Sequence, residues 1–263
     1  MESKARQMLI RMRGNLRGYN DKERLIAEYI LQNPLRIREL SIHALAAELE
    51  VSVGTIVHFC KKHGFSGYRE LKQVLEALPA EFGDAPLEPE GDPLTVLHSV
   101  WLNVEKVLAD TLLVLDQPAF IRAVEAIEQA ERIDFYARGG SARLAETAAR
   151  KFVRWGGHVT FYRDSNQQKL SATQLNGKSV AIAISYSGYT QDVVECLAAA
   201  KKRGAFCIVI TSCEQSPAAR LADCVLLAAI RGPEMFDENE FSKIAQIAIL
   251  DALYFCYIRS HLR

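Results

Sequence analysis

The sequence predicts a chain of two parts: an all-α domain, then an α/β domain in which helices cover both faces of a parallel sheet. Residues 3–78 carry apolar side chains at helical spacing throughout. After residue 94, two helical stretches lead into short apolar runs that alternate with further helical stretches, as in parallel sheets. Residues 79–93 contain four prolines and five acidic residues but no basic one, as expected of a linker. We therefore predict domains at residues 1–78 and 94–263, joined by an acidic linker at residues 79–93.

The helical part shows a start signal before each of its later helices. Asn20 or Asp21, Ser41, Ser52 and Ser66 each precede an apolar stretch of helical period. Side chains of these types accept hydrogen bonds from the first free backbone N–H groups of a helix. We therefore expect four helices that begin directly after these positions.

The two helices after Ser41 and Ser52 have the spacing of a helix-turn-helix. In the second helix Ile56, Phe59 and Cys60 fall on one apolar face, and polar residues fall on the other. A helix of this kind can place its polar face in the major groove of DNA. The predicted DNA contacts are Ser52, Thr55, His58, Lys61, Lys62 and Arg69. The same spacing also fits a plain helical bundle with a solvated polar face, and periodicity leaves both readings open.

Hydroxyl groups and glycines follow two strands of the predicted sheet. The strands are expected at residues 133–137, 158–162, 180–185, 206–211 and 225–228. The segments after the first and the third should meet at the carboxyl edge of the sheet, where open α/β sheets bind ligands. Hydroxyls and free N–H groups at the start of a helix favour an anion, and phosphate is the natural one. The candidate phosphate-binding residues are Gly140, Ser141, Ser185, Ser187, Gly188 and Thr190.

Composition argues against several other kinds of site. The six cysteines form no Cys-x-x-Cys pair, and no group of cysteines and histidines has the spacing of metal ligands, so we expect reduced thiols, no metal site and no cofactor. No apolar stretch approaches the roughly 20 residues of a membrane span, and the charged residues near Met1 do not resemble a secretory signal. These features predict a cytoplasmic protein without a membrane partner.

The sequence assigns no catalytic residue. Isomerisation of a sugar needs a positioned base, and Glu146, Glu195 and His158 are the candidates near the predicted loops. None belongs to a motif that would make it a base. We interpret them as solvated or packed side chains and expect a binding domain without catalysis.

Residues 40–72 resemble the N-terminal domain of the RpiR family of bacterial transcriptional regulators. The shared run includes Ser-Ile at 41–42, Val-Ser at 51–52, Phe-Cys at 59–60 and Gly-Phe at 64–65. The chain departs from the family at His58, where the family usually has arginine. The resemblance implies binding to double-stranded DNA at a palindromic operator by a homodimer or a tetramer.

Residues 130–230 resemble the sugar isomerase (SIS) domain, the expected partner domain in this family. The resemblance implies that Ser141, Ser185, Ser187 and Thr190 bind a sugar phosphate, with the backbone of Gly188 lining the loop. A phosphorylated sugar acid fits the same anchor. Ala137 stands where the family often has glycine.

Together these features predict a DNA-binding transcriptional regulator of carbohydrate metabolism genes, controlled by a phosphorylated sugar effector. Repression relieved by the ligand is the preferred sign, and activation stays open. The alternative is a phosphosugar isomerase with an appended helical domain. A third class is a metabolite-binding adaptor that acts through protein partners.

Overall fold

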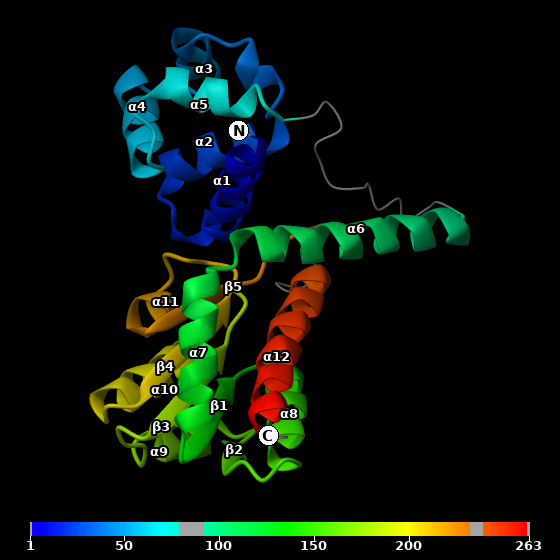
Figure 1. Ribbon diagram of the computed structural model, residues 1–263. Helices are drawn as coiled ribbons and strands as arrows, with labels where there is room; N and C mark the ends of the chain where they lie inside the picture. Colours follow the sequence, from blue (N-terminus) through cyan, green and yellow to red (C-terminus); the bar gives the residue numbers. More distant parts are fainter. Residues whose placement is uncertain (1, 79–91, 232–238, 262–263) are drawn as a thin grey trace. The chain divides into compact units, whose positions relative to one another are not determined.

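The computed structural model describes residues 2–78, 92–231 and 239–261 (Figure 1). The chain divides into two compact units, Met1–Asp84 and Ala85–Arg263. Residues 79–91 of the predicted linker lie outside the described residues. Each unit has its own core, so each is treated separately below.

The first unit is all-α, as predicted. Its helices are α1 (Glu2–Gly14), α2 (Asp21–Gln32), α3 (Ile42–Glu48), α4 (Val53–Lys62) and α5 (Tyr68–Leu75), with 3-10 turns at Leu16–Gly18 and Arg36–Arg38. Apolar side chains from all five helices meet in one core, where Met12, Ile26, Leu45, Phe59 and Leu71 are almost fully buried. Burial of this apolar face stabilises helices that are too short to be stable alone.

Polar caps set the starts of three of these helices. Asn20 and Glu23 form a reciprocal capping box at α2, and Ser41 and Ser52 cap α3 and α4 as predicted. The expected cap at Ser66 is wrong, because α5 begins at Tyr68 with Gly67 in the cap position. The backbone N–H and the hydroxyl of Ser66 instead donate to Oε2 of Glu70, at 2.7 and 2.9 Å. The Glu70 carboxylate takes both donors, and this holds Ser66 outside the helix.

Helices α3 and α4 form the predicted helix-turn-helix. Their axes are bent by 106° across the break at residues 49–52, within the range of about 90–120° for this motif. Ile56, Phe59 and Cys60 are buried in the core, which confirms the apolar seam. The opposite side of α4 is thereby turned to solvent.

The second unit is an α/β fold with five parallel strands. Its elements are α6 (Pro93–Val114), α7 (Gln117–Gln129), β1 (Arg132–Ala137), α8 (Gly140–Val153), β2 (Val159–Phe161), α9 (Ser165–Ala172), β3 (Ser179–Ile184), α10 (Gln191–Lys202), β4 (Phe206–Thr211), α11 (Pro217–Leu221), β5 (Cys224–Leu227) and α12 (Glu240–His261). The strand order is β2-β1-β3-β4-β5. The predicted α/β class is therefore confirmed.

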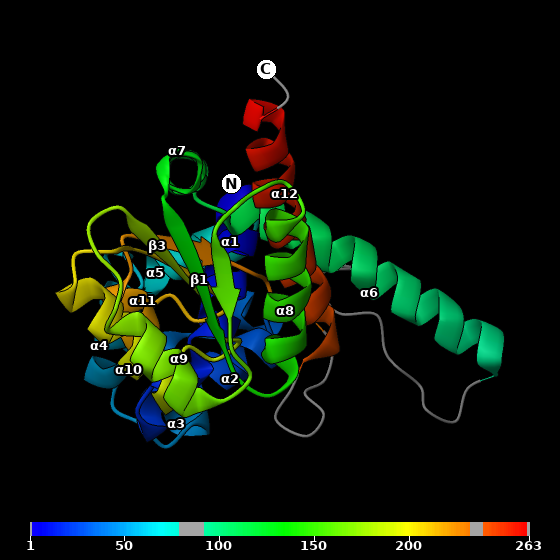
Figure 2. The same ribbon diagram turned by 90° about the horizontal axis from the view of Figure 1, so that it is seen from below.

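Helices cover both faces of this sheet (Figures 1 and 2). Helices α9, α10 and α11 pack on one face, and α7, α8 and α12 pack on the other, with α6 against α12. Among the single helices of the described residues, only α12 has the length and the apolar composition needed to cross a membrane. Its Ala245, Ile249 and Leu253 are buried against neighbouring elements, so it serves as a core helix of this unit.

The sheet brings two loops together at its carboxyl edge. The chain leaves β1 toward β2 on one side and later returns as β3 on the other, so the loops after β1 and β3 flank the switch point. Ala137 and Ile184, the last residues of these strands, are register partners. The residues after them therefore start about 5 Å apart, the spacing of neighbouring strands.

The loop after β3 is held against the start of α11. The Gly188 carbonyl accepts a hydrogen bond from the Ala218 N–H at 3.1 Å. Gly188 has a φ of +70°, and a Cβ added there would lie 2.0 Å from Oγ of Ser216. Only glycine fits this backbone conformation and this close approach.

We expect acid to destabilise the first unit through His63. Burial, together with the charge of Lys62, lowers the pKa of the His63 imidazole to about 4, and the Tyr19 hydroxyl lies 3.0 Å from its Nε2. Between this value and the unfolded pKa near 6.5, the unfolded chain binds more protons, so stability falls as pH falls through that window, by about 3 kcal/mol in all. Urea unfolding between about pH 7 and about pH 4, followed by NMR of the Ile26 and Ile56 methyl groups, measures this. His63→Gln should remove most of the dependence, and a midpoint independent of pH in the natural protein would contradict it.

We expect Gly188→Ala to destabilise the second unit more than Gly204→Ala does. Both glycines have positive φ, +70° and +82°, but the nearest atom to a Cβ at Gly204 is 3.7 Å away. Gly204→Ala should cost the conformational strain alone, about 1–2 kcal/mol. Gly188→Ala adds the clash with Ser216, a further ~1–3 kcal/mol. Trp101 and Trp155 are the chain's two tryptophans, so fluorescence during urea unfolding reports on this unit. Equal losses in the two variants would refute the steric argument.

Candidate functional site

The loop after β3 folds into a compact turn that gathers three of the predicted residues. Ser185, which is buried, accepts a hydrogen bond on Oγ from the Gly188 N–H at 3.1 Å, and the same Oγ lies 3.1 Å from Oγ1 of Thr190. Thr190 directly precedes α10, whose first N–H groups have no carbonyl one turn earlier to accept from. The turn therefore presents hydroxyls beside the positive end of a twelve-residue helix.

Ser187 lies in the same turn but differs in environment. It is partly exposed, and its Oγ accepts a hydrogen bond from the Tyr189 N–H at 3.2 Å. Its hydroxyl hydrogen is then directed away from that bond and is available to an acceptor. An anion at the mouth of the turn would be such an acceptor.

Gly140 and Ser141 start α8 on the neighbouring loop. The loop is anchored by Gln168 of α9, a buried residue that sequence reasoning missed. Its Nε2 donates to the Ala137 carbonyl at 3.0 Å, and its Oε1 accepts from the Ala137 N–H at 3.2 Å. This pair of hydrogen bonds holds the end of β1 against α9. A glutamine in a polar helix carries no sequence signal of such a role.

Ion pairs surround this edge of the sheet. Asp192, in the first turn of α10, lies 3.2 Å from Nε of Arg138 and 2.8 Å from Nζ of Lys169. The hydrogen bond from Lys169, with help from Ser165 and the Arg138 charge, outweighs burial and lowers the pKa of the Asp192 carboxyl. The two cations are therefore already paired with a carboxylate that stays ionised. A ligand anion would have to compete with Asp192 for them.

The candidate catalytic bases are engaged in surface ion pairs or lie at the wrong edge. Glu146 pairs with Arg163 and with Arg150, and Glu195 pairs with Lys169 at 2.6 Å. Hydrogen bonds from these partners lower the pKa of both carboxyls. His158 is exposed and precedes β2, so it lies at the amino edge of the sheet. The geometry brings none of the three into the turn at 185–190.

The exposed face of α4 carries a subset of the predicted DNA contacts. Ser52 is used as the cap: its Oγ accepts from the Thr55 N–H at 3.1 Å and lies 2.8 Å from Oγ1 of Thr55. His58 and Lys61 are exposed. Lys62 differs, because its Nζ lies 2.8 Å from both carboxylate oxygens of Glu23.

The pair of Lys62 and Glu23 joins α4 to α2. The Glu23 carboxylate is largely buried, and the Lys62 ammonium also lies 5.3 Å from the centre of the Tyr19 ring. Burial raises the pKa of Glu23, but the hydrogen bonds from Lys62 and the Asn20 backbone and the Lys62 charge bring it below its usual value. Lys62 thus stabilises the unit, a role that helical spacing did not reveal.

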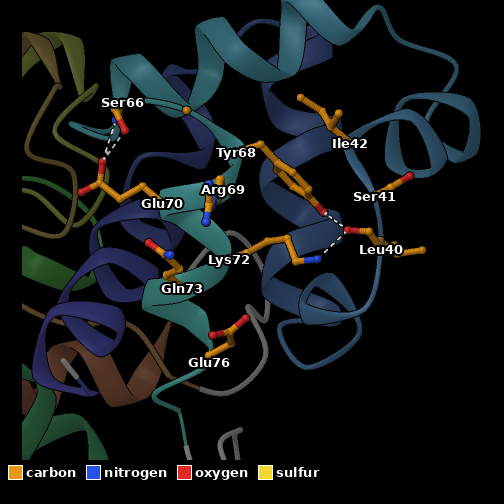
Figure 3. A pocket seen from close by; sticks show the side chains of 11 residues that line it. Leu40, Ser41, Ile42, Ser66, Tyr68, Arg69, Glu70, Lys72, Gln73 and Glu76 are labelled. Atoms are coloured by element: carbon orange, nitrogen blue, oxygen red, sulfur yellow. Dashed lines mark hydrogen bonds between the residues drawn. The ribbon is translucent and has the colours of Figure 1, made fainter.

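Arg69 lies on a different surface from the α4 face. A groove of about 660 Å³ runs between the start of α3 and α5, and Ser41, Ser66 and Arg69 contribute to its lining (Figure 3). The Tyr68 hydroxyl and the Lys72 ammonium donate to the Leu40 carbonyl across it, at 3.2 and 3.0 Å. Arg69 therefore lies beside the capped start of α3. From this position it would contact the DNA backbone, while α4 would make any contacts with the bases.

Comparisons with known proteins agree with both parts of this description. The model of the helix-turn-helix domain of the rpiR family matches residues 6–81, and the SIS domain model matches residues 126–255. An HTH-type transcriptional regulator of Caldanaerobacter subterraneus is 34% identical over 240 residues, which are 90% of this chain and 85% of that protein. The HTH-type transcriptional regulator HexR of Pseudomonas aeruginosa is 33% identical over 253 residues, with 94% and 88% covered.

A solved structure covers nearly the whole chain. The Vibrio vulnificus NanR protein complexed with ManNAc-6P matches with a TM-score of 0.60 at 26% identity, over 96% of this chain and 92% of that one. The likeness extends over both units, as expected for shared domain content. The chain belongs to the RpiR family of helix-turn-helix transcriptional regulators, with a SIS domain as its second part.

Proposed function

We propose that the protein is a cytoplasmic repressor of carbohydrate metabolism genes, which binds a palindromic operator as a homodimer and is released by a phosphorylated sugar. The observation that carries the effector site is the turn at 185–190, which sets Ser185, Ser187 and Thr190 at the start of α10. Hydroxyl donors and a helix N-terminus suit a phosphate dianion.

The neighbouring loop completes the proposed phosphate site. Ser141 and the start of α8 lie across the switch point from Ser185, so two helix N-termini face the same edge. The NanR protein was solved with ManNAc-6P, a sugar phosphate, which supports this class of ligand. Arg138 and Lys169 stay bound to Asp192 in this proposal, and the phosphate is held by neutral donors.

The proposed domain has no catalytic activity. An isomerase base must lie within hydrogen-bond reach of a sugar carbon's proton. Glu146 and Glu195 instead form ion pairs with arginine and lysine side chains at the surface, and these partners favour the ionised carboxylates. The family relatives are transcriptional regulators, which supports the same conclusion.

On the DNA side, we place Thr55, His58 and Lys61 in the major groove and Arg69 on the phosphate backbone. Ser52 contributes as the cap that starts α4, and Lys62 contributes by holding α4 against α2. A homodimer would present two copies of α4 to adjacent half-sites of a palindrome. Whatever the ligand does to DNA affinity, DNA must do equally to ligand affinity.

Ser185→Ala is expected to move the effector response to much higher ligand concentrations and leave DNA binding intact. Loss of a hydrogen bond to a charged ligand should weaken binding roughly tenfold to a hundredfold. The measurement is fluorescence anisotropy with DNA from upstream of the protein's own gene, titrated with hexose 6-phosphates and 6-phosphogluconate. Ser179→Ala is the matched control, because Ser179 is equally buried at the other end of β3.

A response of Ser185→Ala equal to that of the natural protein would move the effector away from this turn. Turnover of any of these compounds without DNA binding would favour the alternative of a phosphosugar isomerase.

Lys61→Ala and Lys62→Ala, adjacent lysines on α4, should differ in effect. Lys61→Ala should weaken DNA binding for all sequences and lower the slope of log affinity against log salt by about 1, with the fold unchanged. Lys62→Ala leaves the largely buried Glu23 carboxylate without its ammonium partner and should cost roughly 1–3 kcal/mol of stability in the first unit. DNA titrations at several salt concentrations and urea unfolding separate the two effects. A stability loss for Lys61→Ala and none for Lys62→Ala would reverse the assignment.

A further inference from the structure

Three buried polar side chains of the second unit have atoms with no hydrogen-bond partner among the described residues. They are Oγ of Ser212, Oγ of Ser242, and both Oε1 and Nε2 of Gln246. Ser242 and Gln246 are fully buried on α12, and Ser212 is nearly so. Buried polar groups in folded proteins are nearly always paired, so these unpartnered groups require a physical explanation.

Ser212 lies beside the proposed phosphate turn. It directly follows β4, and its N–H donates to the Tyr186 carbonyl at 3.0 Å. Tyr186 is the residue after Ser185, so this bond ties Ser212 to the turn at 185–190. The Ser212 hydroxyl is therefore at the carboxyl edge of the sheet.

The start of α12 lies at the same edge. The Ser242 N–H donates to Oδ1 of Asn239 at 2.8 Å, and Nδ2 of Asn239 donates to the Arg231 carbonyl at 2.8 Å. Arg231 follows β5 by four residues. Asn239 thus anchors the first turn of α12 near the end of that strand.

The contacts between α12 and α8 show which residues of the two helices lie at the same height along their axes. Lys151 of α8 pairs with Asp251, and the Phe152 ring packs at 5.0 Å from the Tyr257 ring, so the two helices run in the same direction (Figure 2). Because both rise by about 1.5 Å per residue, Ser242 lies level with the first turn of α8, which begins at Gly140. Gln246 lies one turn further along.

Helix α12 lies between α7 and α8 and also contacts β4. The helix therefore packs on the face of the sheet that α7 and α8 cover, next to β4. Ser212 follows β4 and the start of α12 is held to the segment after β5, so these groups belong to elements that meet the carboxyl edge of the sheet, which also carries Ser185.

We propose that Gln246, Ser242 and Ser212 bind the hydroxyl groups of a phosphorylated sugar whose phosphate is held at the turn at 185–190. This inference rests on the proposed function. An amide and two hydroxyls offer donors and acceptors without charge, and sugar hydroxyls need both. The cluster thus selects a neutral polyhydroxylated chain. Because these groups are buried, a covering side chain or the start of α12 shifts when the sugar binds.

The test separates the sugar from the phosphate. Gln246→Met keeps the volume of the side chain and removes both polar atoms. Calorimetric titration of the full-length protein with inorganic phosphate and with glucose, fructose and N-acetylmannosamine 6-phosphates gives a preference ratio for the sugar. We expect phosphate affinity to stay unchanged, and the affinity for the best hexose 6-phosphate to fall about tenfold or more.

Stability supplies a second readout. Replacement of an unpartnered buried amide by an apolar side chain should leave the thermal midpoint equal or higher. Leu250→Met places methionine one turn along the buried face of α12 without removing a polar atom. This control should change neither readout. Ser212→Ala removes one hydroxyl only and gives the same comparison if Gln246→Met does not fold.

Two results would overturn the inference, and they differ from failure of the proposed function. Wild-type ratios of sugar to phosphate affinity in Gln246→Met and Ser212→Ala would mean that these groups pair with buried water instead. A natural protein that binds phosphate as tightly as every hexose 6-phosphate would also overturn it. If Ser185→Ala loses affinity for both inorganic phosphate and the sugar phosphates, the proposed phosphate site stands in either case. If the natural protein binds neither ligand, the proposed function itself is refuted.

Discussion

The position of β1 between β2 and β3 is the constraint on which the second unit depends. Because the chain leaves β1 in one direction and returns on its other side, the loops after β1 and β3 diverge at the carboxyl edge and leave room between them. The same arrangement sets the N-termini of α8 and α10 at the same edge, on opposite faces of the sheet. Gln168 and the Ala218 N–H then hold the two loops, from outside the segments that carry the hydroxyls.

Charge is used in a similar way in both units. Lys62 with Glu23, and Asp192 with Arg138 and Lys169, are partly or largely buried pairs that hold separate elements together. Their charges are therefore committed within the fold. In the proposed function, the groups that bind ligands are instead neutral or exposed: serine and threonine hydroxyls at the sheet edge, and His58, Lys61 and Arg69 on the helical unit.

A path for coupling within the second unit follows from its packing. Helix α12 contacts the sheet at β4 and α6 on its other side, and α6 is the first helix after the predicted linker. A shift of α12 on ligand binding would therefore reach α6 through direct contact. Such coupling requires that the contact between α12 and α6 has two states with different ligand affinity. It does not require a continuous chain of contacts from α6 to the DNA-binding surface.

The fold class, the helix-turn-helix, all five strand positions to within a residue and the turn at 185–190 could be predicted from the sequence. These are local patterns, in which period, caps and glycines act within a few residues. Tertiary structure decided which of the predicted contacts are available. Lys62 is paired with a residue 39 positions away, and the β1 loop is held by a glutamine 31 positions away. The predicted cap at Ser66 is absent, because the N–H and the hydroxyl of Ser66 donate to the nearby Glu70 carboxylate instead. Side-chain partners distant in sequence leave no periodic signal, because they are selected by packing between elements, and only the folded chain brings them within hydrogen-bond distance.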